Sequence, residues 1–171
     1  MSNIKHYGLV SLTLGLIAAA SALLITSSNL LTEDKIAQNE IDNITKGINF
    51  IFGDNAKIKT ESAIDSYKYV DYVYEIQSDV DLGYVFRTSG SNMYGKMTLI
   101  VGFDKSDNFV SMKTIVNEQT YTKEVEKFIT DVDNGTRSVE DVSCGATYGA
   151  KLVRDMVNEA QKASNEKVWK K

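Results

Sequence analysis

The sequence predicts an α+β domain, an antiparallel sheet with packed helices, preceded by one N-terminal transmembrane helix. Residues 7–26 contain no charged residue. Several short segments between residues 69 and 116 alternate apolar and polar residues, as strands do. Apolar residues recur at helical spacing before and after these segments. We therefore divide the chain of 171 residues into an anchor at 1–26, a membrane-proximal helix at 27–53, a domain at 54–163 and a polar tail at 164–171.

The stretch from Tyr7 to Thr26 is about as long as the ~20 residues that a membrane-spanning helix needs. Lys5 precedes it and Glu33 follows it, which favours an N-terminus inside the cell and a domain outside the cell membrane. A cleavable signal peptide is the alternative, because residues 18–22 are all small. We favour a retained single-pass anchor, since the apolar stretch is longer than the roughly 7–15 residues of a signal-peptide core.

An amphipathic helix follows the anchor. Thr32 is a suitable N-cap, and acidic residues follow it in the first turn. Gly53 is a suitable end. The apolar positions Ala37, Ile41, Ile44, Ile48 and Ile51 recur at spacings of four, three, four and three residues.

The predicted sheet is a meander of consecutive strands joined by short polar turns. Residues 54–71 are mixed in character and predict a loop with a short strand. Each later strand has one apolar face, for example Val110, Met112, Thr114 and Val116 in the last one. The clear strands are expected at 69–77, 82–87, 97–103 and 109–116, a short helix at 121–130, and a final helix at about 149–163.

Composition excludes several functions. The net charge is −4. Lys5 is the only charged residue among the first 26, so the rest of the chain has 18 basic and 23 acidic residues and a net charge of −5. This negative charge argues against a nucleic-acid partner. The only His is His6 in the N-terminal tail and the only Cys is Cys144. We therefore expect no Ser–His or Cys–His catalysis, no Cys-rich metal site and no independent catalytic site. Any redox role requires a bound organic cofactor.

The segment from Gly90 to Met97 nearly matches a phosphate-binding P-loop. Its last position is Met97, where the P-loop needs the hydroxyl that binds magnesium, and a strand pattern follows instead of a helix. The segment therefore predicts a glycine-rich turn between two strands.

A motif with small residues precedes the last predicted helix. Gly145 and Ala146 allow a bulky group to approach the backbone, and Thr147 follows them at or just before the helix N-terminus. Free N–H groups and the helix dipole favour a phosphate there. The alternative is that Thr147 is an ordinary N-cap.

These residues resemble the motif Asp-x-x-(Ser/Thr)-Gly-Ala-Thr of a known family. The match covers Asp141, Gly145, Ala146 and Thr147, and departs at Cys144, where the family usually has Ser or Thr. The family is the FMN-binding domain shared by the G subunit of the Rnf complex and the C subunit of the sodium-translocating NADH:quinone reductase. The resemblance implies that a flavin transferase attaches FMN to Thr147 through a phosphoester.

The resemblance also implies where the flavin lies. Cys144 stands inside the motif and Tyr148 directly follows it. The turn with Gly90, Tyr94 and Gly95 is similar to a family turn near the flavin. The segment around Thr120 and Tyr121 is similar to a family segment in which such residues contact the flavin edge or the phosphate, with Gln119 where an acid usually stands.

The function implied is electron transfer through covalent FMN. The chain would be a membrane-anchored subunit of an Rnf-type ion-translocating ferredoxin:NAD oxidoreductase, with the other membrane subunits of the complex as partners. One alternative is a stand-alone extracytoplasmic flavinylated electron-transfer protein. The other is a non-enzymatic membrane-anchored module without flavin, in which Thr147 only caps a helix.

Overall fold

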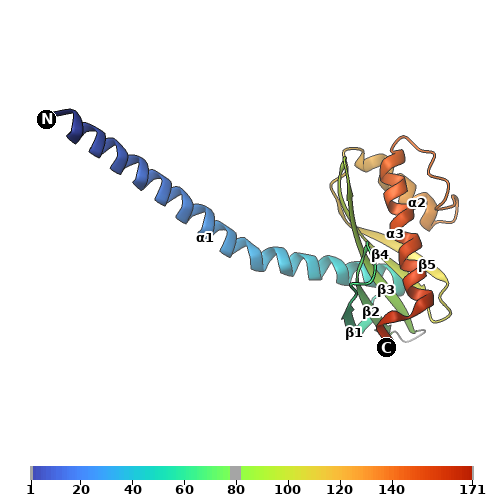
Figure 1. The fold of residues 1–171 in the computed structure, drawn as a ribbon. Helices are drawn as coiled ribbons and strands as arrows, with labels where there is room; N and C mark the ends of the chain where they lie inside the picture. Colours follow the sequence, from blue (N-terminus) through green and yellow to red (C-terminus); the bar gives the residue numbers. More distant parts are fainter. Residues whose placement is uncertain (1, 78–81, 171) are drawn as a thin grey trace. The chain divides into compact units, whose positions relative to one another are not determined.

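The computed structural model describes residues 2–77 and 82–170, with the side chains at 2–6, 8–10, 24–25, 27–34, 36–37, 82 and 168 left out. The chain divides into two compact units, Met1–Asp42 and Asn43–Lys171. The second unit is α+β, as predicted (Figure 1). Its elements are the end of α1 (Ser2–Phe52), β1 (Lys57–Ala63), β2 (Val70–Gln77), β3 (Leu82–Asn92), β4 (Gly95–Asp104), β5 (Phe109–Asn117), α2 (Thr122–Asp133), α3 (Thr147–Glu166) and the short 3₁₀ helix η1 (Val168–Lys170).

The sheet has the strand order β1-β2-β3-β4-β5, and every neighbouring pair is antiparallel. The predicted meander is therefore confirmed. The β3–β4 pairing continues without a register shift to Asn92 opposite Gly95. Most of the predicted turn at 90–97 therefore belongs to the two strands, and only Met93 and Tyr94 form the hairpin turn. A P-loop would open a helix, whereas Lys96 here lies in β4.

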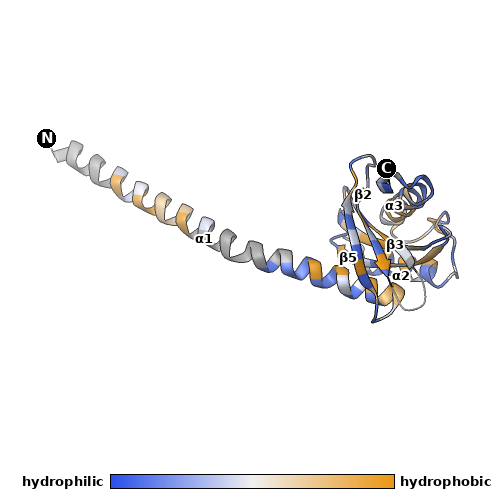
Figure 2. Ribbon diagram, turned by 90° about the horizontal axis from the view of Figure 1, so that it is seen from below, coloured by the Kyte–Doolittle hydropathy of each residue, from blue (hydrophilic) through white to orange (hydrophobic). Residues whose placement is uncertain are grey.

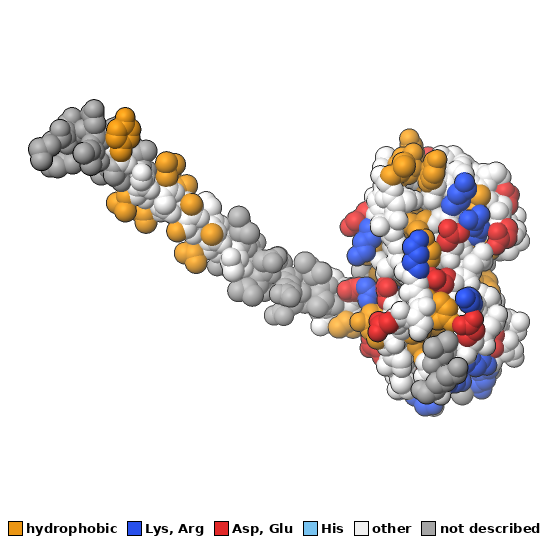
Figure 3. All heavy atoms as spheres, viewed as in Figure 1, with side chains coloured by type: hydrophobic (Ala, Val, Ile, Leu, Met, Phe, Trp, Pro, Cys, Tyr) orange, Lys and Arg blue, Asp and Glu red, His pale blue; other side chains and the backbone are white. Residues whose placement is uncertain are grey.

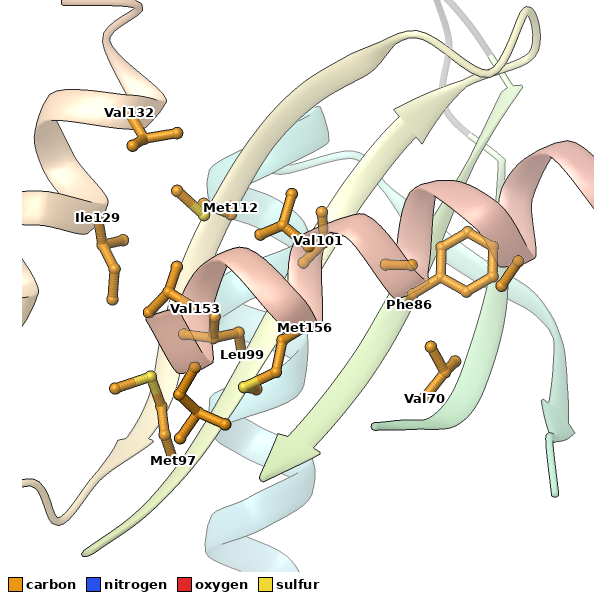
Figure 4. Packing of buried hydrophobic residues seen from close by; sticks show 14 of the residues in the cluster. Val70, Phe86, Met97, Leu99, Val101, Met112, Ile129, Val132, Val153 and Met156 are labelled. Atoms are coloured by element: carbon orange, nitrogen blue, oxygen red, sulfur yellow. The ribbon is translucent and has the colours of Figure 1, made fainter. Parts of the chain in front are cut away.

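One face of the sheet forms the main core with α2 and α3. Figure 4 shows Leu99, Val101 and Met112 of the strands close to Val153 and Met156 of α3. All five side chains are buried, which removes apolar surface from water and is the main stabilising contribution. The predicted apolar stripe of α3 is buried throughout: Leu152, Val153, Met156, Val157 and Ala160.

The opposite face is covered by residues 43–52 of α1, which belong to the same unit as the sheet. Ile44 and Ile48 are buried against Tyr74, Ile76 and other strand side chains. Figure 2 shows hydrophobic and hydrophilic residues mixed along this part of α1, as expected for an amphipathic helix. The helix ends before Gly53, as predicted.

Beta bulges change two details of the predicted strand faces. A register shift between Val70 and Tyr72 turns Val70 to the α3 side, although strict alternation along the strand would place it on the face of Tyr72 and Tyr74. A second shift pairs Phe103 with Phe109 and leaves Val110 40% exposed, so its predicted place beside Met112 is wrong. An extra residue in one strand reverses the faces of the residues on one side of it.

The C-terminal segment extends the domain beyond the predicted end at residue 163. The helix α3 continues to Glu166, and Ser164 is buried. The ring of Trp169 lies 5.0 Å from that of Phe86 and 5.4 Å from that of Tyr84, measured between centroids. The segment at 164–170 is thus packed on the sheet.

In the described part of the chain, no helix is both long and apolar enough to cross a membrane. The predicted span at 7–26 includes residues 8–10 and 24–25, whose side chains lie outside the described residues. The membrane span therefore stays a prediction.

Candidate functional site

The motif that ends at Thr147 lies at the positive end of α3. Thr147 is the first residue of this helix and Ala146 is its N-cap. The first N–H groups of an α-helix have no partner within the helix, and the first turn of α3 contains no acidic residue. The dipole and these N–H groups therefore favour an anion next to Thr147.

The hydroxyl of the half-buried Thr147 donates a hydrogen bond to the carbonyl oxygen of Cys144, with 2.9 Å between the oxygens. An N-cap side chain would instead accept a hydrogen bond from a backbone N–H of the first turn. No such capping bond is present at α3. The Thr147 side chain therefore does not cap the helix.

A cavity of about 270 Å³ lies beside Thr147. Its wall is formed by the β3–β4 turn, the segment after β5, the helix α2 and the first residues of α3. The lining residues are Tyr94, Gln119, Tyr121, Val125, Gly145, Ala146, Thr147, Tyr148 and Gly149. The structure thus gathers Thr147, its neighbours and two of the predicted tyrosines from distant parts of the chain around one space.

Three tyrosine rings surround the cavity. The ring of Tyr94 lies 5.6 Å from that of Tyr148 and 5.9 Å from that of Tyr121, measured between centroids. Tyr121 and Tyr148 are about half exposed, and Met93 at the tip of the hairpin is 80% exposed. Figure 3 shows hydrophobic side chains gathered on the surface at the end of the domain where α3 begins. The cavity therefore has an apolar aromatic rim that is open to solvent.

Hydrogen bonds attach the β3–β4 turn to its neighbours. The side chain of Asn92 donates to the carbonyl of Tyr148 at 3.1 Å. The backbone N–H and the hydroxyl of Thr120 both donate to the carbonyl of Tyr94, at 2.9 and 3.2 Å. Thr120 is exposed and outside the cavity lining, so its role here is to hold Tyr94.

Two of the predicted glycines also lie outside the cavity. Gly95 has φ +137°, and a Cβ there would overlap the carbonyl oxygen of Glu118. Gly90 lies in a separate hollow with Lys68, Tyr69 and Lys96. Both glycines shape the turn and its packing, and neither faces the space beside Thr147.

Cys144 and Asp141 lie in the loop before the cavity. The half-buried Cys144 lines a second hollow, of about 250 Å³, with Lys127, Asp131 and Arg137 among its neighbours. Only Gly145 lines both hollows. Cys144 is therefore not among the residues that line the cavity beside Thr147.

Asp141 is exposed and folds the loop on itself. Its carboxylate accepts hydrogen bonds from the hydroxyl and the backbone N–H of Ser143, and Arg137 lies 3.8 Å away. The Ser143 bonds, with a smaller contribution from Arg137, hold the pKa of Asp141 below its usual value. The carboxylate is therefore charged at neutral pH and holds the loop before Thr147 through its bonds to Ser143.

The sequence did not single out Gln119, Val125 and Gly149 as site residues. Gly149 permits close packing, because a Cβ there would overlap Val125 of α2. Gln119 is 4% exposed, which is unusual for a Gln between a strand and a helix. The only sequence signal for a role of Gly149 in the site was that a glycine stands two positions after Thr147.

Comparison with protein-family models and with curated proteins gives no match for this chain. Among the residues that the structure describes, no group of three or more His, Cys, Asp or Glu side chains could hold a metal ion.

Proposed function

We propose that Thr147 holds FMN through a phosphoester and that the chain is a membrane-anchored electron-transfer subunit of an Rnf-type ion-translocating complex. The observation that supports this most is the position of Thr147. Its hydroxyl is at the first residue of α3 and in the wall of a cavity with an aromatic rim. The motif from Asp141 to Thr147 supplies the resemblance to the FMN-binding family.

The phosphate fits the start of α3. A phosphodiester on the Thr147 oxygen keeps one negative charge and lies beside the first-turn N–H groups, which typically contributes ~0.3–1 kcal/mol at an exposed site. Gly145 leaves the approach open, because a Cβ there would meet only the Glu124 side chain, at 3.5 Å. The residues present therefore suit a bulky phosphate ester.

The rest of FMN fits the cavity and its rim. Ligand pockets usually enclose about 300–1,000 Å³, so a cavity of about 270 Å³ takes only part of the cofactor. The rings of Tyr94, Tyr121 and Tyr148 offer flat apolar surface to an isoalloxazine ring. When bound, FMN would supply one-electron or two-electron transfer, and this chain would hold and orient it.

Attachment requires a separate enzyme. The folded unit has no His to activate the hydroxyl of Thr147, since the only His is His6. A flavin transferase that uses FAD and a divalent metal would form the bond between the Thr147 oxygen and the FMN phosphorus. The pyrophosphate bond of FAD breaks, AMP leaves, and a base of the transferase takes the hydroxyl proton.

The location follows from the uncharged stretch at 7–26, which we propose to be a retained anchor with the domain outside the cell. Covalent attachment suits this location, because a free cofactor would diffuse away. Co-purification with other membrane subunits would support the complex, whereas a chain that is always isolated alone would favour a stand-alone flavinylated protein.

The test is co-expression of the full chain with a flavin transferase. The denatured band should fluoresce yellow, and the peptide containing Thr147 should gain the mass of one FMN. Thr147→Ala should abolish the signal, and Asp141→Ala should weaken it because the loop loses its bonds to Ser143. Thr130→Ala is the matched control, since its hydroxyl also donates to a carbonyl at 2.9 Å and it lies outside the cavity lining. A colourless parent or a fluorescent Thr147→Ala band would refute the proposal.

A further inference from the structure

Gln119 is a buried amide in the wall of the cavity. Its side chain is 4% exposed, and its Nε2 donates a hydrogen bond to the carbonyl oxygen of Gly95. A carbonyl can only accept, so the NH₂ end of the amide must face Gly95. The other end, Oε1, is thereby directed away from Gly95.

Oε1 lies beside the first turn of α3. It is 3.5 Å from the position that a Cβ on Gly149 would take. Within the residues that the structure describes, no donor forms a hydrogen bond with Oε1, although the backbone N–H and carbonyl of Gln119 are bonded to Asn117 and Thr122. The residue lines the cavity, so this oxygen can accept a hydrogen bond from a ligand that carries a hydroxyl or N–H group.

The place of this acceptor limits the part of a ligand that can reach it. Gly149 is two residues after Thr147, and two residues advance a helix by about 3 Å along its axis. The free acceptor is therefore close to where a phosphate on Thr147 would lie. In a phosphorylated polyol chain, the carbons that follow the esterified CH₂ bear hydroxyl groups, which are hydrogen-bond donors.

We infer that Oε1 of Gln119 accepts a hydrogen bond from a hydroxyl of the ribityl chain of FMN, an inference that rests on the proposed function. The site then has two complementary parts: N–H groups at the start of α3 for the phosphate, and the Gln119 oxygen for the adjacent polyol.

The experiment uses the full chain made without a transferase, titrated with FMN, riboflavin and lumiflavin by quenching of flavin fluorescence. Riboflavin lacks the phosphate, and lumiflavin lacks the whole ribityl chain. Gln119→Met should weaken FMN and riboflavin binding at least fivefold and leave lumiflavin binding within twofold. The parent should bind riboflavin more tightly than lumiflavin, and the variant should lose that preference.

Gln161→Met is the matched control, because the Gln161 amide also donates to a backbone carbonyl, that of Asp107 at 2.8 Å, away from the cavity. It should leave all three affinities unchanged.

The variant Gln119→Glu guards against a folding defect. When protonated, the new side chain can donate to the Gly95 carbonyl and keep an acceptor toward the cavity, so riboflavin affinity should match the parent at acid pH and fall as the carboxyl ionises. The parent should show no such step.

Unchanged riboflavin affinity in Gln119→Met, an equal loss for lumiflavin, or no flavin binding by the parent would each overturn the inference. FMN attachment in co-expressing cells decides the proposed function separately. A parent that is labelled on Thr147, together with a Gln119→Met variant that binds riboflavin normally, would refute the role of Gln119 alone.

Discussion

Gly95→Ala should destabilise the domain more than any ordinary change in a surface turn. Gly95 has φ +137°, a region that side chains rarely adopt, and such strain costs about 1–3 kcal/mol. The added Cβ would also overlap the carbonyl oxygen of Glu118 and lie 3.1 Å from the nitrogen of Gln119. Overpacking of this kind typically costs a further ~1–3 kcal/mol. We expect a total loss of about 2–6 kcal/mol in the free energy of unfolding.

The neighbouring backbone cannot move away without further loss. The N–H of Glu118 donates to the carbonyl of Lys96, and the N–H of Thr120 donates to that of Tyr94, both at 2.9 Å. These two bonds fix the segment that the new Cβ would push. Moving it would lengthen both bonds and displace Gln119 and Tyr94 from the cavity wall.

Urea unfolding followed by Trp169 fluorescence measures this change, because the only Trp packs against Phe86 and Tyr84 in the folded unit. Gly135→Ala is the control. Gly135 has φ +70°, and a Cβ there would meet nothing within 4 Å, so only a strain of about 1–2 kcal/mol is expected. If Gly95→Ala loses no more stability than Gly135→Ala, the proposed collision with Glu118 is refuted.

Two further predictions concern hydrogen bonds that hold helices to the rest of the domain. Asp133→Ala should lower the free energy of unfolding by about 1–3 kcal/mol, because the Asp133 carboxylate accepts from the N–H of the buried Met112 at 2.8 Å. Asp131→Ala, whose hydrogen bonds run through its main-chain carbonyl, should cost less in the same urea titration. Burial, and to a smaller extent the hydrogen bond to Glu166, raises the pKa of Tyr67 to about 12. The neutral phenol therefore stabilises the fold fully below pH 10, and this contribution is lost as the pH rises through 12. Absorbance at alkaline pH should show a phenol transition near pH 12 that Tyr67→Phe removes; identical titration curves for the parent and the variant would contradict it.

The helices and the order of the strands could be predicted because each depends on a local period. The stripe from Leu152 to Ala160 follows the helical repeat, and it is buried in α3 as expected. The faces of β2 and β5 could not be derived in full, because a bulge beside Val70 or Val110 depends on the partner strand. The alternation of the sequence is the same with the bulge or without it.

Without the resemblance, which added Tyr94 and Tyr121, the candidate site could be predicted only where the chain is continuous. Gly145 to Tyr148 are neighbours in sequence, and the structure places them in one cavity wall. Cys144 and Asp141 belong to the same motif, yet they lie outside the lining of this cavity. The loop that carries them is folded by two hydrogen bonds, from the Thr147 hydroxyl to the carbonyl of Cys144 and from the N–H of Ser143 to the carboxylate of Asp141. The side chain of Gln119 is held in the cavity wall by its hydrogen bond to the carbonyl of Gly95. The two residues are 24 positions apart in the sequence, and no local pattern indicates their contact.

The shape of the cavity bears on why a flavin here would be covalently attached. A cavity of about 270 Å³ with an exposed tyrosine rim buries too little of FMN to hold it tightly by contact alone. A phosphoester to Thr147 removes that requirement, because retention no longer depends on burial. The exposed rim can then leave one edge of the ring accessible to an electron donor or acceptor. On the proposed function, a shallow pocket and a covalent bond therefore belong together: a deeper pocket would hold FMN without the bond but would bury the edge through which electrons pass.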